Sequence, residues 1–183
     1  MLRVILLAVI AALAFAVPVG ALENENLLVT MPKGYKVGFH NKTARELMSE
    51  MVPESETVEN WTEMVTVQIF FNLRDVSPSQ YRARVQKLWA DACPGSTFTK
   101  VKEGIENLYP TQTWTQKCPV NKQTGKPELT LFKGVQGRDS FYLVQKAYKF
   151  EPTAEQTAVW ASFLDSVKVC DTRSPTQPCT MGK

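Results

Sequence analysis

The sequence predicts an α+β fold, in which two main helices pack on a twisted antiparallel β-sheet that two disulfides staple. Three observations lead to this prediction. Helix start signals precede one-sided apolar spacing at 77–92 and at 154–166. Alternating, β-branched and aromatic stretches joined by short turns fill most of the remaining chain. Four cysteines follow an N-terminal apolar segment that is typical of exported proteins. Several strands with only two helices favour α+β over a parallel doubly wound fold.

The N-terminal segment, residues 1–21, is predicted to be a cleavable signal peptide. Arg3 precedes an apolar run from Val4 to Val17, which is shorter than the roughly 20 residues that span a bilayer. Pro18 and the small residues up to Ala21 predict cleavage at that point. An uncleaved membrane anchor is the alternative. The mature chain, 22–183, has the length of a single α+β domain, and we expect it in the periplasm or secreted.

All four cysteines lie in the mature chain. Their even number in an exported protein predicts disulfides. Of the three possible pairings we predict Cys93 with Cys118, at the end of a helix and before a following hairpin, and Cys170 with Cys179, closing a short polar C-terminal tail. Zinc sites use closely spaced cysteine pairs, which are absent from this sequence, so we expect no metal.

The first helix is predicted over 77–92 because several start signals coincide. Ser77 is the expected N-cap, Pro78 occupies the first helical position, and Gln80 completes a capping box. Its apolar stripe consists of Tyr81, Val85, Leu88, Trp89 and Ala92. This one-sided pattern predicts a helix that covers a sheet.

The second helix is predicted over 154–166. Thr153 and Gln156 form its expected capping box. Its apolar stripe consists of Val159, Trp160, Phe163, Leu164 and Val167. We expect this helix to cover the sheet as well.

The strands are predicted from alternation and β-branched content. They span 61–71, 97–102, 111–117, 128–136 and 140–150. The first has near-continuous apolar content typical of a central strand, and Gly137-Arg138-Asp139 predicts a tight turn between the last two. Leu27–Met31 and Lys36–His40 predict a short opening hairpin, while 45–52 fits either a strand or a helix.

Short motifs at both ends of the mature chain suggest a family. The opening Met31-Pro32-Lys33-Gly34-Tyr35 precedes a sheet-forming middle, and the last helix runs into 166–169. In this order of elements the chain resembles the exported PsbP-like and DcrB-like α/β/α sandwich families, and also uncharacterised exported proteins of Gram-negative bacteria. The resemblance implies a small accessory or binding domain and supplies no site residues.

Few residues in the chain are suited to catalysis. His40 is the single histidine and has no identifiable nucleophile near it in sequence. Thr124-Gly125-Lys126 lacks the rest of a phosphate-binding loop, so we expect no cofactor. The formal net charge of +3 does not point to nucleic acid.

Charged residues gather in two parts of the chain. The acidic part is Glu46, Glu50, Glu54, Glu56, Glu59 and Glu63. We interpret it as a solvated face, with calcium or partner binding and carboxylate catalysis as alternatives. Lysines interleaved with aromatic residues over 100–149 fit either a solvated face or a site for anionic polymers or lipid headgroups.

The candidate binding residues come from both parts. They are Trp61, Glu63, Trp114, Lys133, Arg138 and Lys146. The leading hypothesis is a non-enzymatic exported accessory or binding domain that acts on a protein partner or an envelope component. The alternatives are a carboxylate-dependent hydrolase or transferase, and a carrier that holds a small apolar ligand between the sheet and a helix.

Overall fold

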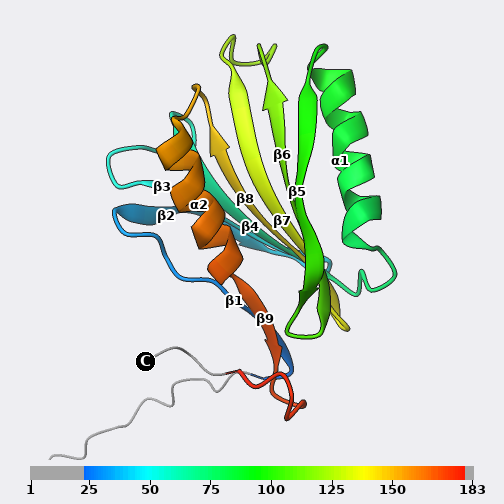
Figure 1. The fold of residues 1–183 in the computed structure, drawn as a ribbon. Coiled ribbons are helices and arrows are strands. Elements are labelled where there is room, and N and C mark those ends of the chain that lie inside the picture. Colours follow the sequence, from blue (N-terminus) through cyan, green and yellow to red (C-terminus); the bar gives the residue numbers. More distant parts are fainter. Residues whose placement is uncertain (1–22, 180–183) are drawn as a thin grey trace, which may run out of the picture.

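The computed structural model describes residues 23–179 (Figure 1). The predicted signal peptide, 1–21, therefore lies outside the described residues and stays a prediction. The elements are β1 (Glu25–Leu28), β2 (Tyr35–Lys42), β3 (Glu46–Pro53), β4 (Glu63–Phe71), α1 (Pro78–Ala92), β5 (Thr97–Glu106), β6 (Tyr109–Cys118), β7 (Glu128–Gln136), β8 (Ser140–Tyr148), α2 (Ala154–Ser166) and β9 (Lys168–Asp171). None of these helices is long and apolar enough to cross a membrane.

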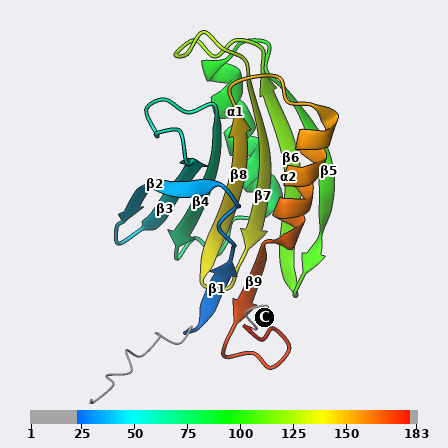
Figure 2. The ribbon, with the colours of Figure 1, turned by 90° about the vertical axis from the view of Figure 1, so that its left-hand side faces the viewer.

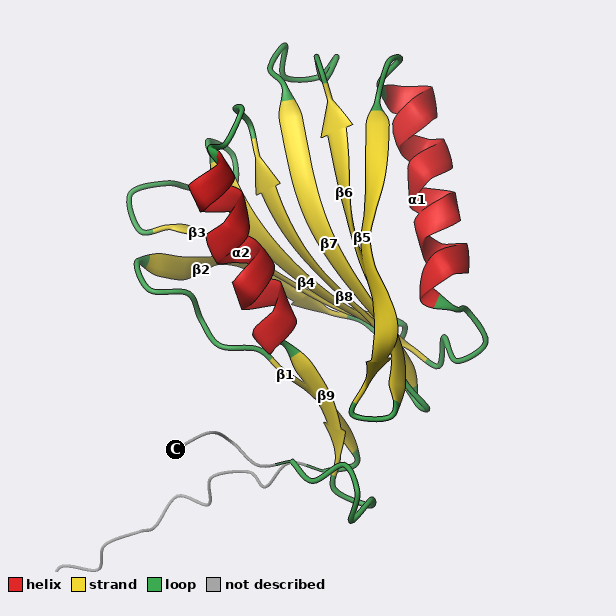
Figure 3. Cartoon of the chain, viewed as in Figure 1, coloured by secondary structure: helices red, strands yellow, loops and turns green. Residues whose placement is uncertain are grey.

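Seven strands form one antiparallel sheet in the order β2-β3-β4-β8-β7-β6-β5. The prediction of an α+β fold with two helices on an antiparallel sheet is confirmed, and Figure 3 shows the helices in red against the yellow strands. The strand predicted to be central, β4, lies between β3 and β8. The ambiguous segment 45–52 is a strand, because its residues pair with both β2 and β4.

The two helices lie on opposite faces of this sheet (Figure 2). Successive side chains of a strand point to opposite faces, so β8 contributes to two separate cores. Val144 and Tyr148 pack beneath α2. Phe141 and Leu143 pack with the α1 residue Trp89. The fold is therefore a three-layer sandwich with one core on each side of the sheet.

Both helices begin as predicted. In each, the N-cap side chain accepts a hydrogen bond from the third helical residue, and the glutamine there bonds back to the cap. The apolar stripes are narrower than predicted, however, because the sheet contacts only one row of residues. On α1 this row is Tyr81, Val85 and Trp89, at four-residue spacing. Leu88 and Val159 were predicted to be apolar contacts but are 66% and 60% exposed.

The predicted opening hairpin is wrong. Leu27 and its neighbours do pair as a strand, but β1 pairs antiparallel with β9 at the other end of the described chain. The next strand, β2, pairs only with β3 and forms an edge of the large sheet. The short separation of β1 and β2 in the sequence favoured pairing between them, whereas in the structure β1 pairs with a strand far along the chain.

Both predicted disulfides are confirmed. Cys93 bonds to Cys118, which ties the end of α1 to the end of β6. Cys170 bonds to Cys179 and closes a short loop after β9 begins. The loop also has a backbone anchor, since the Asp171 amide donates to the carbonyl of Gln177 at 2.8 Å.

Candidate functional site

Two of the six candidate binding residues contact each other. Glu63 begins β4 and forms an ion pair with Lys146 on the neighbouring β8. Trp61 lies two residues before β4, where it contacts Lys149 instead. Trp114 and Lys133 lie on β6 and β7, and Arg138 lies in the β7–β8 turn at the opposite end of β8. The six residues therefore do not form one site.

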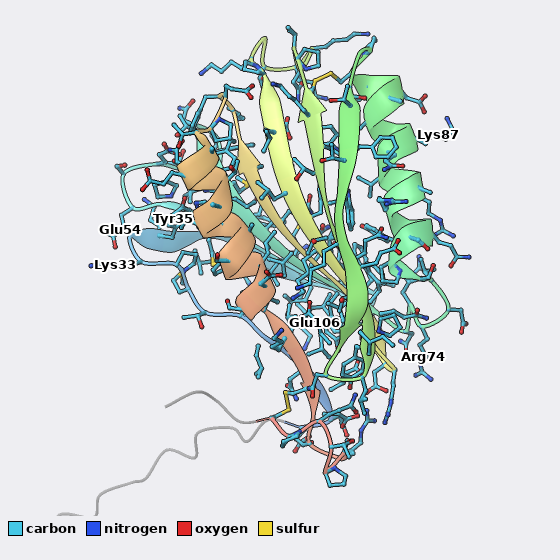
Figure 4. The ribbon with its side chains drawn as sticks, viewed as in Figure 1. Lys33, Tyr35, Glu54, Arg74, Lys87 and Glu106 are labelled. Carbon is cyan, nitrogen blue, oxygen red and sulfur yellow. A yellow bond between two sulfur atoms is a disulfide. The ribbon has the colours of Figure 1, made fainter. Side chains whose placement is uncertain are left out.

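Lys146 is the centre of a buried polar cluster beneath α2. Its Nζ donates hydrogen bonds to Glu63 Oε2 and to the Tyr35 hydroxyl, both at 2.6 Å. The Tyr35 hydroxyl also donates to Glu63 Oε2, at 2.9 Å. The ammonium lies 4.0 Å from the centre of the Trp160 ring and 4.6 Å from that of Tyr148. Figure 4 shows Tyr35 beside α2.

The charges in this cluster are balanced internally. Burial lowers the pKa of Lys146 to about 8, although the hydrogen bond and charge of Glu63 act in the opposite direction. Burial, followed by Glu63, raises the pKa of the Tyr35 hydroxyl. The Lys146 side chain is 0% exposed, and two of its three donors form hydrogen bonds within the chain. The cluster therefore clamps α2 to the sheet and presents no cation to a partner.

Lys133 holds the other end of the same helix. Its Nζ donates to the carbonyl oxygens of Leu164 at 2.9 Å and Val167 at 2.8 Å, and it pairs with Glu106 Oε2 at 2.7 Å. The last carbonyls of a helix lack partners within the helix and carry partial negative charge. Lys133 therefore caps the C-terminus of α2 from inside the core.

Trp114 is also interior, stacked on Phe132 with ring centres 4.8 Å apart. Three of the candidate binding residues, Trp114, Lys133 and Lys146, are therefore buried, and their binding role stays a prediction. The sequence did carry a signal for the lysines. Each shares the strand face of apolar neighbours, such as Leu131 on β7 and Val144 on β8, and that face is buried.

The acidic part of the chain is dispersed over different roles. Glu46 accepts a hydrogen bond from Gln68 at 2.8 Å. Glu56 accepts one from the Thr62 backbone at 2.7 Å. No group of acidic, histidine or cysteine residues among those described has the arrangement of a metal site. Of five surface hollows on the described residues, one contains a member of this acidic group, Glu59, and none contains two. Within these five hollows, the two carboxylates that such catalysis needs are not found together.

A small-ligand carrier also finds little support. The hollow between α2 and the sheet, lined by Leu131 and Leu164, has a volume of about 60 Å³. Pockets for small molecules have volumes of roughly 300 Å³ or more. Near Trp61 there is a larger, open hollow of about 370 Å³, where Lys149 Nζ lies 3.8 Å from the centre of the Trp61 ring. Its lining includes the polar side chains of Glu59, Asn60 and Lys126, unlike the apolar cavity of a carrier.

The β5–β6 hairpin exposes apolar side chains at its tip. Glu106 pairs with Tyr109, so the turn has two central residues, Asn107 and Leu108. Both have positive φ, 50° and 66°, as in a type I′ turn. Leu108 is 61% exposed, and Ile105 beside it is 73% exposed. This tip was not predicted from the sequence, because an Asn-Leu pair is not a recognised turn signal.

No family model matches the chain, and no curated protein matches it. Two solved structures are similar to it in part. One is a mutant of the protein Mog1, with 11% identity and a TM-score of 0.44, covering 76% of this chain and 84% of the other. The second is the Saccharomyces cerevisiae Ran-binding protein Mog1p, with 12% identity and a TM-score of 0.43, covering 78% and 84%. TM-scores this low carry no argument about function, and the resemblance to PsbP-like and DcrB-like families stays a prediction.

Proposed function

We propose that this protein is a non-enzymatic binding domain, periplasmic or secreted, which binds a protein partner through the tip of its β5–β6 hairpin. Two disulfides support an oxidising compartment. The observation that carries the proposed binding role is the pair of exposed apolar side chains, Ile105 and Leu108, on a supported turn. Exposed apolar side chains presented together are typical of protein interaction sites.

The backbone of Leu108 supports this interpretation. A φ of 66° places a leucine in the left-handed region, which costs about 1–2 kcal/mol for a residue with a Cβ. Glycine is favoured at this position of a type I′ turn because it avoids that cost. A leucine here gives no compensating burial, since most of it is exposed. Such strain is typical of functional positions, and contact with a partner would bury the side chain.

Hydrogen bonds to β9 and to the C-terminal disulfide loop fix the turn, so the tip has one conformation. Asn107 Nδ2 donates to the carbonyl of Val169 on β9 at 2.7 Å. Gln177 Nε2 donates to the Asn107 carbonyl at 2.6 Å. Gln177 is buried and lies within the loop that Cys170 and Cys179 close. The disulfide loop thus supports the hairpin, and a pre-organised site loses less entropy on binding.

Site-specific crosslinking tests the proposal. A photoreactive amino acid at position 108 of the oxidised mature protein, exposed to an envelope extract of the source organism, is expected to yield a discrete crosslinked protein. The same probe at position 159 on α2 is the matched control, because Val159 is almost equally exposed. Ile105→Ser is expected to abolish the crosslink from position 108, whereas Val159→Ser is expected to leave it unchanged. Identical products from positions 108 and 159, or none from 108, contradict the proposal.

A further inference from the structure

Another of the five hollows lies at the end of the sheet where the β2–β3 turn, the end of β4 and the β7–β8 turn meet. Its volume is about 500 Å³, and its lining includes Lys42, Phe71, Asn72, Arg74, Asp139 and Ser140. Figure 4 shows Arg74 on the other side of the molecule from Lys33 and Glu54. The hollow is thus separate from the Lys146 cluster, and no part of the proposed hairpin contact uses it.

Two cations of this hollow are positioned by contacts that leave their charges uncompensated. Lys42 Nζ lies 5.8 Å from the centre of the Phe71 ring, within the range of a cation–π contact. Arg74 Nη2 donates to Asn72 Oδ1 at 3.3 Å, which occupies one of five guanidinium donors. Among the side chains that the structure describes, neither cation has a carboxylate partner.

The one carboxylate that lines the hollow, Asp139, pairs with Arg173, which also pairs with Asp171. Asp139 Oδ2 accepts from Arg173 Nη2 at 2.7 Å. Arg138 and Arg45 lie in the two turns beside the hollow, and within the described residues they too have no ion pair. Asp75 follows Arg74 in the chain but does not line the hollow. The balance of charge facing the hollow is therefore positive.

The loops that carry these cations are fixed to one another. The Asn72 amide donates to the Asp139 carbonyl at 3.0 Å, and the Phe71 amide donates to the Arg45 carbonyl at 2.9 Å. Gln136 Nε2 donates to the Arg74 carbonyl at 2.7 Å. Two backbone hydrogen bonds and one from a side chain thus hold these three segments in place, so a ligand would not have to order them.

We propose that this hollow binds a phosphate group, held between Lys42 and Arg74, with the rest of the ligand lying toward Phe71. A phosphate monoester carries nearly two negative charges at neutral pH and matches two uncompensated cations. Arginine recognises phosphate with two parallel hydrogen bonds, and lysine adds a point charge. The volume of about 500 Å³ accommodates a substituent on the phosphate. The phosphate belongs either to a soluble monoester or to a phospholipid headgroup, whose phosphodiester carries one negative charge.

The test uses the full mature, oxidised protein and two probes. Glycerol 3-phosphate represents the soluble ester, with glycerol as its uncharged control. Vesicles of phosphatidylglycerol represent the headgroup, with phosphatidylcholine vesicles as their control. Titration followed by backbone amide NMR shifts, or co-sedimentation for the vesicles, is expected to show binding of at least one anionic probe, with the soluble-probe shifts centred on Asn72 and Ser140.

Three variants with the same change of charge localise the site. Lys42→Gln and Arg74→Gln are each expected to weaken binding about tenfold or more, the cost of one lost charged hydrogen bond. Lys33→Gln removes an exposed lysine far from the hollow and is expected to leave binding unchanged. Thermal unfolding checks that all three fold. Binding of neither probe at low ionic strength, or an equal loss in Lys33→Gln, overturns the proposal. Either result leaves the hairpin crosslinking experiment unaffected.

Discussion

Replacing Lys146 with methionine removes the buried ammonium and keeps a side chain of similar length beneath α2. In the folded protein the pKa of Lys146 is about 8, against an ordinary value of 10.5. Between these values the unfolded chain holds the proton and the folded protein has lost it. The free energy of unfolding of the wild type therefore rises with pH in this range.

The expected size of the effect follows from the two pKa values. Integrating the proton linkage from pH 8 to pH 10 for values of about 8 and 10.5 yields a rise of about 2 kcal/mol. Burial raises the pKa of Tyr35 and Tyr148 above the ordinary value of 10.0. When the tyrosines of the unfolded chain lose their protons, above about pH 10, the free energy of unfolding falls. The comparison therefore ends at pH 10.

The measurement is urea unfolding of wild type and Lys146→Met at several pH values across this range. The difference in unfolding free energy, wild type minus variant, is expected to increase by about 2 kcal/mol. Lys33→Met, which removes an exposed lysine, is the control and is expected to show no such trend. A difference that stays flat or falls with pH refutes the assignment of Lys146 as a buried ammonium that loses its proton early.

Three further outcomes are expected. Glu63→Ala leaves Lys146 buried without its carboxylate and is expected to cost about 3 kcal/mol at neutral pH by urea unfolding; an unchanged midpoint contradicts the clamp. Leu108→Gly relieves the positive φ and is expected to stabilise the fold by about 1 kcal/mol, whereas a loss of stability contradicts the strain argument. In the chain-entropy model, removing Cys93–Cys118 costs about 3.5 kcal/mol and removing Cys170–Cys179 about 2.5 kcal/mol, from sequence separations of 25 and 9; the reverse order in paired serine variants contradicts that model.

The elements that could be predicted are those whose signals are local. Each capping box places an N-cap and its glutamine three residues apart, so the starts of both helices are visible in a few residues. The same holds for β7 and β8, which a tight turn at Gly137 joins. The strand that pairs with β1 could not be predicted, because Leu27 pairs with Val169. No local sequence pattern specifies a pairing between residues so far apart in the chain.

The candidate site was harder to predict, because burial depends on tertiary packing. Trp114 and the two lysines were chosen as aromatic and basic residues in strands, and the strand face that each occupies turned out to be covered. The hollow at Lys42 and Arg74 combines residues from separate turns. Only the topology brings those turns together, and the basic part noted in the sequence, 100–149, contains neither Lys42 nor Arg74.

The pairing of β1 with β9 constrains the order in which the chain can fold. Leu28 pairs with Lys168, and Glu25 accepts a hydrogen bond from the Arg138 amide at 2.7 Å. A chain that emerges from its N-terminus first exposes β1 long before either partner is available. Contacts this distant in sequence slow folding, so β1 would wait unpaired until almost the whole chain has appeared. In the last step β9 pairs with β1 and Cys170 comes close to Cys179. The contacts that support the tip of the β5–β6 hairpin therefore form last.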